Sequence, residues 1–110
     1  MLKAGTIPII NTNIKNSHQR IENLFKSIFA DVPNTSISLN DESVIIEHKD
    51  QSNPDAASIE IIRIKEIYKV SYWDGYSLAE DESEKDLNKA LKIFKRFYKK
   101  MAKNLIRFSK

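Results

Sequence analysis

The stretch IEIIRIKEIYKVSYW, residues 59–73, is β-branched or aromatic along most of its length, a composition typical of β-strands. We expect two strands, divided near Lys65 and Glu66. The side chains expected to face the core alternate along both strands: Ile62 and Ile64, then Tyr68, Val70 and Tyr72. No glycine marks the turn, so the alternative is a single long bent strand.

The residues before this stretch predict a β-hairpin. DVPNT, residues 31–35, has the composition of a turn, and the hydrophobic period after it changes from 3.6 to 2. Ile37 and Leu39 alternate with serines, NDE at residues 40–42 turns the chain, and Val44 and Ile46 then alternate with Ile45 and Glu47. The polar loop KDQSNPDAAS, residues 49–58, leads on to the two expected strands.

Apolar residues at helical spacing predict a first helix, which begins with Asn16 or Ser17 as its N-cap and ends before Pro33. Its apolar face consists of Ile21, Leu24, Phe25, Ile28 and Phe29. Residues 1–13 show no clean period, and we interpret them as an irregular lead-in that can lend Ile7, Ile9 and Ile10 to the core.

A second helix of roughly 25 residues is expected after Ser83, the candidate N-cap. The negative charges of Glu84 and Asp86 would lie near the N-terminus of this helix, where they interact favourably with the positive end of the helix dipole. One apolar stripe follows: Leu87, Ala90, Leu91, Phe94, Phe97, Tyr98, Met101 and Leu105. The sequence therefore predicts an α+β fold, a single domain over residues 1–110 with a four-stranded antiparallel sheet covered by an N-terminal and a long C-terminal helix, in the order α-β-β-β-β-α.

Length and composition narrow the class of protein. A chain of 110 residues forms one domain with a real core. It has no cysteine, which excludes disulfides, cysteine-ligated zinc and thiol nucleophiles. The longest apolar runs are a few residues, far short of a membrane-spanning helix, and the N-terminus lacks a secretory signal. We therefore expect a cytoplasmic protein with no membrane partner.

Charge is divided unevenly along the chain. Residues 1–84 carry 8 Lys and Arg against 14 Asp and Glu, a net charge of −6. Residues 85–110 carry 10 Lys and Arg against Asp86 alone, a net charge of +9. An acidic body is thus followed by a basic helix.

No catalytic signature is present. His18 and His48 could form an acid–base pair for phosphodiester cleavage, but the polar side of a helix start and a strand end are ordinary places for a histidine. The acidic segments lack the spacing of a calcium loop. We expect a protein that is not an enzyme and that needs no cofactor or metal.

The basic helix allows a nucleic-acid interface. Lysines along one face could lie against phosphates, and the candidate residues are Lys92, Arg96, Lys99 and Lys103. A solvated helix face is the alternative interpretation.

The stretch after the fourth expected strand combines aromatic and acidic residues. Asp74 and Gly75 predict a turn, and strand alternation places Trp73 on the face opposite Tyr72. Aromatic rings beside carboxylates are typical of protein-binding hot spots that attract a cationic partner. The alternative is that Trp73 packs under residues 1–13 and that residues 80–86 only begin a helix.

YKVSYWDGYSLAEDESEKDLNKALKIFKRFYKKM, residues 68–101, resembles the small immunity proteins of bacterial polymorphic toxin systems, including contact-dependent growth inhibition. The shared pattern is a strand, an aromatic-Asp-Gly-Tyr turn, an acidic linker and a long amphipathic helix. The resemblance implies a cytoplasmic, non-catalytic inhibitor that blocks the active site of one cognate toxin, often a nuclease. The residues it assigns to this contact are Trp73, Asp74, Tyr76, Glu80, Asp81 and Glu82. Immunity proteins against nucleases are commonly acidic, whereas this chain has a net charge of +3, so the acidic body would face the toxin.

A second segment, IIRIKEIYKVSYWDGYSL at residues 61–78, resembles the hairpin of ribosome-dependent messenger-RNA-cleaving toxins. That resemblance would imply a small ribonuclease. In that family the chain usually closes with another strand, whereas a long helix is expected here, and no catalytic set can be assigned. The oligomeric state is left open, with Trp73 or a sheet edge as candidate contacts.

Overall fold

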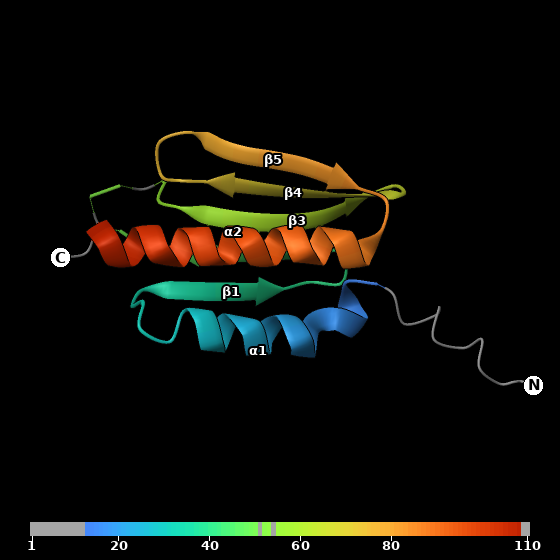
Figure 1. The fold of residues 1–110 in the computed structure, drawn as a ribbon, viewed down its shortest axis with the longest axis horizontal. Coiled ribbons are helices and arrows are strands. Elements are labelled where there is room, and N and C mark those ends of the chain that lie inside the picture. Colours follow the sequence, from blue (N-terminus) through green and yellow to red (C-terminus); the bar gives the residue numbers. More distant parts are fainter. Residues whose placement is uncertain (1–12, 51, 54, 109–110) are drawn as a thin grey trace, which may run out of the picture.

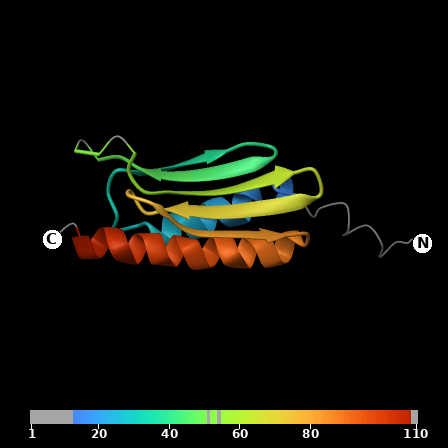
Figure 2. The same cartoon turned by 90° about the horizontal axis from the view of Figure 1, so that it is seen from above.

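The computed structural model describes residues 13–50, 52–53 and 55–108. The expected lead-in, with Ile7, Ile9 and Ile10, lies outside these residues except for Asn13. The described chain forms two layers, a sheet and a pair of helices that lie on the same face of it (Figures 1 and 2).

The sheet is an antiparallel meander in which each strand pairs with the next in the sequence, in the order β1-β2-β3-β4-β5. Its strands are β1 (Thr35–Leu39), β2 (Ser43–His48), β3 (Ser58–Ile64), β4 (Ile67–Trp73) and β5 (Leu78–Glu84). The expected α+β class, single antiparallel sheet and two helices are confirmed. The predicted hairpin and the division of residues 59–73 at Lys65 and Glu66 are confirmed as well. Lys65 supplies the turn without glycine by adopting a φ of 58°.

The expected number of four strands is wrong, because the acidic segment after the β4–β5 turn is a fifth strand and not a linker. Ser83 and Glu84 lie within β5, so Ser83 does not cap the second helix. Asp86 takes that role, since its Oδ1 accepts a hydrogen bond of 2.9 Å from the backbone N–H of Asn88. Helix α2 begins at Leu87 and ends at Phe108.

The orientation expected for the third strand is also wrong. Ile59 and Ile61 are fully buried, whereas Ile62 is half-buried and Ile64 is 49% exposed. The register with β4 explains this, because Ile59 pairs with Tyr72 and Ile61 with Val70, and cross-strand partners share one face of a sheet. Because isoleucines occur on both faces of β3, the sequence does not show which face of this strand is buried.

Helix α1 (His18–Ile28) follows the 3₁₀ turn η2 (Lys15–Ser17) and is half the length of α2. The two helices meet through a chain of rings. Phe25 stacks on Phe29 with centroids 5.2 Å apart, Phe29 contacts Tyr98 at 5.9 Å, and Tyr98 meets the edge of Phe94 at 4.6 Å. The predicted stripe of α2 is buried from Leu87 to Met101, so α2 supplies most of the cover over β3 and β4. Within the described residues, no helix is long and apolar enough to cross a membrane.

Candidate functional site

The β4–β5 turn holds three of the aromatic and acidic residues that the sequence singles out. Trp73 ends β4, and Asp74 and Tyr76 lie in the turn. Oδ1 of Asp74 accepts hydrogen bonds of 2.9 Å from the backbone N–H groups of both Tyr76 and Ser77, the Asx-type arrangement expected after a strand. The side chain of Tyr76 is 87% exposed at the tip of this turn.

The loop between β2 and β3 braces the turn from one side. Nδ2 of Asn53 donates a hydrogen bond of 2.8 Å to the carbonyl of Gly75. The indole N–H of Trp73 donates one of 2.7 Å to the carbonyl of Asp55. Gly75 has a φ of +102°, and a Cβ there would lie 3.4 Å from Asn53 Nδ2. The backbone conformation therefore favours glycine at this position, while the space around it would admit a Cβ.

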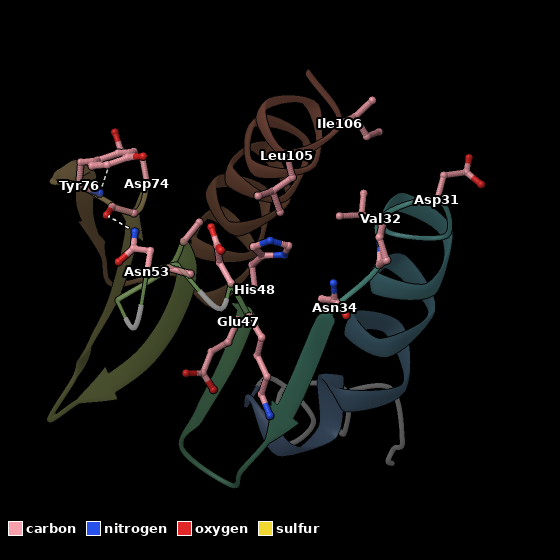
Figure 3. A pocket seen from close by; sticks show the side chains of 16 residues that line it. Asp31, Val32, Asn34, Glu47, His48, Asn53, Asp74, Tyr76, Leu105 and Ile106 are labelled. Atoms are coloured by element: carbon pink, nitrogen blue, oxygen red, sulfur yellow. Dashed lines mark hydrogen bonds between the residues drawn. The ribbon is translucent and has the colours of Figure 1, made fainter. Parts of the chain in front are cut away.

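The turn forms one wall of an open cavity of about 1170 Å³ at this end of the sheet (Figure 3). The opposite wall comes from residues 31–34, after α1, and from Leu105 and Ile106 near the end of α2. Its ionisable lining residues are Asp31, Glu47, His48, Lys49, Asp50 and Asp74. Carboxylates therefore outnumber cationic side chains around this cavity, whose lining also includes the apolar residues Val32, Leu105 and Ile106. His48 Nδ1 is shielded from solvent and has no hydrogen-bond partner among the described residues.

Local hydrogen bonds favour the ionised form of two of these carboxylates. The hydroxyl and backbone N–H of Ser52 hold the pKa of Asp50 below its ordinary value of 3.8. The backbone N–H groups of Ser77 and Tyr76 likewise lower the pKa of Asp74. Hydrogen bonds to a carboxylate favour its ionised form, so both side chains are negatively charged at neutral pH.

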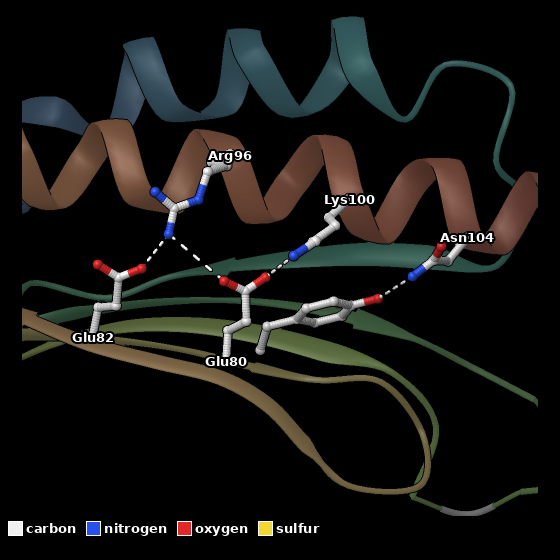
Figure 4. Close-up of polar contacts among 6 residues, drawn as sticks. Glu80, Glu82, Arg96, Lys100 and Asn104 are labelled. Atoms are coloured by element: carbon white, nitrogen blue, oxygen red, sulfur yellow. Dashed lines mark hydrogen bonds and ion pairs between the residues drawn. The ribbon is translucent and has the colours of Figure 1, made fainter.

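The remaining residues of the expected contact lie on β5 and do not point into the cavity. Glu80 and Glu82 face α2, where Arg96 forms ion pairs with both and Lys100 with Glu80 (Figure 4). Asp81 faces the other side of the sheet and forms an ion pair of 3.6 Å with Lys69. The structure thus separates the six expected contact residues into a turn group and a strand group.

A signal for this strand was available in the sequence. Glu80, Glu82 and Glu84 recur at every second residue, and Arg96 and Lys100 are four residues apart. These are the spacings of one strand face and one helix face. By contrast, no pattern in the sequence indicates that the loop with Asp50 and Asn53 belongs to this site, because only the fold brings that loop next to the β4–β5 turn.

The four candidates for nucleic-acid binding lie on the exposed side of α2. Arg96 is engaged with β5, as described above. Lys92, Lys99 and Lys103 form no ion pair with any residue that the structure describes. At about 1.5 Å per residue they extend over about 16 Å of the helix.

The two histidines do not form a pair. His18 Nε2 lies 2.8 Å from the carbonyl of Asn40, next to the β1–β2 turn, whereas His48 ends β2 at the other end of the hairpin. The length of β2 separates these two places by about 17 Å at about 3.4 Å per residue. No cluster of three metal-ligating side chains occurs among the described residues.

Comparisons with protein-family models, with curated proteins and with solved structures found no match to this chain. Three features of the chain itself therefore bear on its function: the β4–β5 turn, the acidic cavity and the basic face of α2.

Proposed function

We propose that the chain is a non-catalytic immunity protein, which binds a cationic protein toxin, with a nuclease as the expected class, and blocks its active site. The observation that carries this proposal is the position of Tyr76. Its side chain is 87% exposed, while the backbone beneath it is held by Asp74 and Asn53. A large exposed ring on a fixed turn loses little conformational entropy on binding and is a frequent hot-spot residue.

The charge around Tyr76 indicates the kind of partner. Asp31, Glu47, Asp50 and Asp74 line the neighbouring cavity, and hydrogen bonds favour the ionised forms of Asp50 and Asp74. Enzymes that cleave nucleic acids carry basic surfaces because they bind phosphates. Such a surface would be attracted to these carboxylates and repelled by the lysines of α2.

The ion pairs of β5 narrow the proposed contact. Glu80 and Glu82 already neutralise Arg96 and Lys100, so a partner would have to compete with α2 for them. We therefore centre the contact on Asp74 and Tyr76 and extend it over the acidic cavity, with β5 in a supporting role.

A growth-protection experiment tests the proposal, with the product of the gene immediately upstream as the probe. That product is expected to arrest growth when it is expressed alone, and co-expression of this chain is expected to restore growth. Tyr76→Ala and Asp31→Lys should abolish or weaken protection, because both side chains are exposed at the proposed contact.

Asp41→Lys is the matched control. It makes the same charge reversal at an exposed position in the β1–β2 turn, at the other end of the hairpin from the cavity. Asp41→Lys should protect as well as the unaltered chain does. Failure of the unaltered chain to protect contradicts the immunity function, and full protection by Tyr76→Ala contradicts the proposed contact.

Nucleic-acid binding is the second candidate, favoured by the lysines of α2 that form no ion pair with a described residue. Fluorescence anisotropy with random-sequence RNA and duplex DNA in physiological salt separates the two candidates. Binding at low micromolar concentration that weakens steeply with salt and is lost in the Lys92→Glu, Lys99→Glu double variant would place nucleic-acid binding first. Absence of binding under these conditions removes the second candidate.

A further inference from the structure

The two edges of the sheet differ in charge. Edge strand β5 carries acidic side chains on both faces, with Glu80, Glu82 and Glu84 towards α2 and Asp81 on the other side. Edge strand β1 has the sequence TSISL and contains no charged residue, proline or glycine. Charges and proline are the usual protection of an exposed edge against pairing with another strand, so within the described part of the chain β1 is the edge without such protection.

The backbone of β1 is arranged to accept another strand. Hydrogen bonds join Asn40 N to Ser43 O at 2.9 Å and Lys49 N to Asn34 O at 2.8 Å, so the even-numbered residues of this segment bond to β2. Bonded and non-bonded pairs alternate along an antiparallel ladder. The N–H and C=O groups of Thr35, Ile37 and Leu39 therefore point away from β2, towards the free edge.

The core is also incompletely covered on this side. The hydrophobic residues that pack against it but stay half-buried are mostly in α1 and β1: Leu24, Phe25, Ile28, Ile37 and Leu39. Phe29 contacts Tyr98 of α2, which turns that side of α1 towards α2. Ile28 lies about 100° and Leu24 about 140° from Phe29 around the helix axis, on the side of α1 that turns away from α2.

We propose that two copies of this chain pair through β1 to form a symmetric dimer with a continuous antiparallel sheet. With the two-fold axis at Ile37, Ile37 pairs with Ile37 of the second copy, Thr35 with Leu39, and Ser36 with Ser38. None of these cross-strand pairs between the two β1 strands contains a charged side chain. The same operation at β5 would bring Asp81 against Asp81 and Glu80 against Glu82, where like charges oppose pairing. A second copy therefore fits β1 and not β5, and it buries Leu24, Ile28, Ile37 and Leu39.

Sedimentation velocity of the full chain at micromolar concentration tests this inference, which does not depend on the proposed function. The expected mass is twice the 12.7 kDa of one chain. In the variant Ser36→Lys, Ser38→Lys, each lysine would lie opposite a lysine of the other copy, and we expect dimerisation to weaken roughly tenfold or more. Both serines are exposed, so the monomer should keep its fold, which circular dichroism checks.

The matched variant Ser36→Lys, Ser38→Glu places opposite charges across the same axis and should restore the dimer. A chain that is monomeric at these concentrations overturns the inference. A monomer is also the result expected if β1 pairs with a strand of a different protein and not with a second copy. A dimer that the paired lysines do not weaken also overturns it and places the interface elsewhere, for example at Leu78, which is 54% exposed.

Discussion

The hydroxyl of Tyr72 on β4 accepts a hydrogen bond of 3.0 Å from Nδ2 of Asn104 on α2. The hydroxyl of Tyr98, in the same core, is buried without a hydrogen-bond partner among the described residues. Burial raises the pKa of both phenols, and the bond from Asn104 opposes this rise at Tyr72 alone. Tyrosine hydroxyls therefore make two opposite contributions to stability within one core.

Tyr72→Phe should destabilise the protein by about 1 kcal/mol, the typical net value of a hydrogen bond between partly buried groups. Urea unfolding followed by circular dichroism measures the change. Asn104→Ala should remove the same bond, so the double variant should lose less than the sum of the two single losses. Strictly additive losses would show that the bond contributes nothing.

Tyr98→Phe should instead leave the free energy of unfolding unchanged or raise it by up to about 1 kcal/mol, because it removes a buried hydroxyl that has no partner. The ring, which carries the contacts to Phe29 and Phe94, is retained. The same urea experiment applies. A clear loss of stability would mean that the hydroxyl has a hydrogen-bond partner in solution.

Lys65→Gly should stabilise the protein by roughly 0.5–1 kcal/mol, because a left-handed φ is costly for a lysine and not for a glycine. Lys65 has a φ of 58° in the β3–β4 turn. The neighbouring change Glu66→Gly is the control, since Glu66 is not among the described residues with positive φ, and it should destabilise. Thermal unfolding compares the two variants, and an equal effect of both would contradict the strain at Lys65.

Glu80→Gln should lower the free energy of unfolding by about 0.5–1 kcal/mol at low salt, because it weakens the ion pairs with Arg96 and Lys100. At about 1 M salt, where charges are screened over about 3 Å, most of the difference should disappear. Glu60→Gln is the control on the open face of the sheet, where no ion pair to Glu60 occurs within the described chain. A loss that does not depend on salt would indicate packing as the cause.

The stability contributed by Asp74 should depend on pH. Because backbone hydrogen bonds lower its pKa in the folded protein below the ordinary 3.8, the charged form stabilises the fold above that value. The contribution is lost as the pH falls through the folded pKa. The unaltered chain should therefore exceed Asp74→Asn in stability at neutral pH, by less than about 1 kcal/mol, and the two should converge in acid. A difference that stays constant with pH would contradict this assignment.

Most of the fold follows from periodicity in the sequence. The apolar stripe from Leu87 to Met101 and the alternation around Val44 and Ile46 each have one interpretation, and both are confirmed. The buried face of β3 could not be predicted from periodicity, because both faces of this strand carry apolar side chains: Ile59 and Ile61 on one, Ile62 and Ile64 on the other. Only the register with β4 decides between the two faces.

The fifth strand escaped prediction because its composition is not that of a typical strand. Residues 78–84 have little strand propensity of their own, and Glu80 and Glu82 occupy positions that face α2 through their ion pairs with Arg96 and Lys100. The turn at Asp74 and Gly75 could be predicted from local chemistry. The cavity beside it could not, since its walls come from segments that are distant in the sequence.

The order of the elements also determines when the core can close during synthesis. The sheet is complete at Glu84, but its inner face is covered largely by α2, whose buried residues continue to Ala102. At about 5–20 residues per second, translating the intervening segment takes roughly one to four seconds. The core around Val44, Ile59 and Val70 can therefore close only after the residues up to Ala102 have been added to the chain.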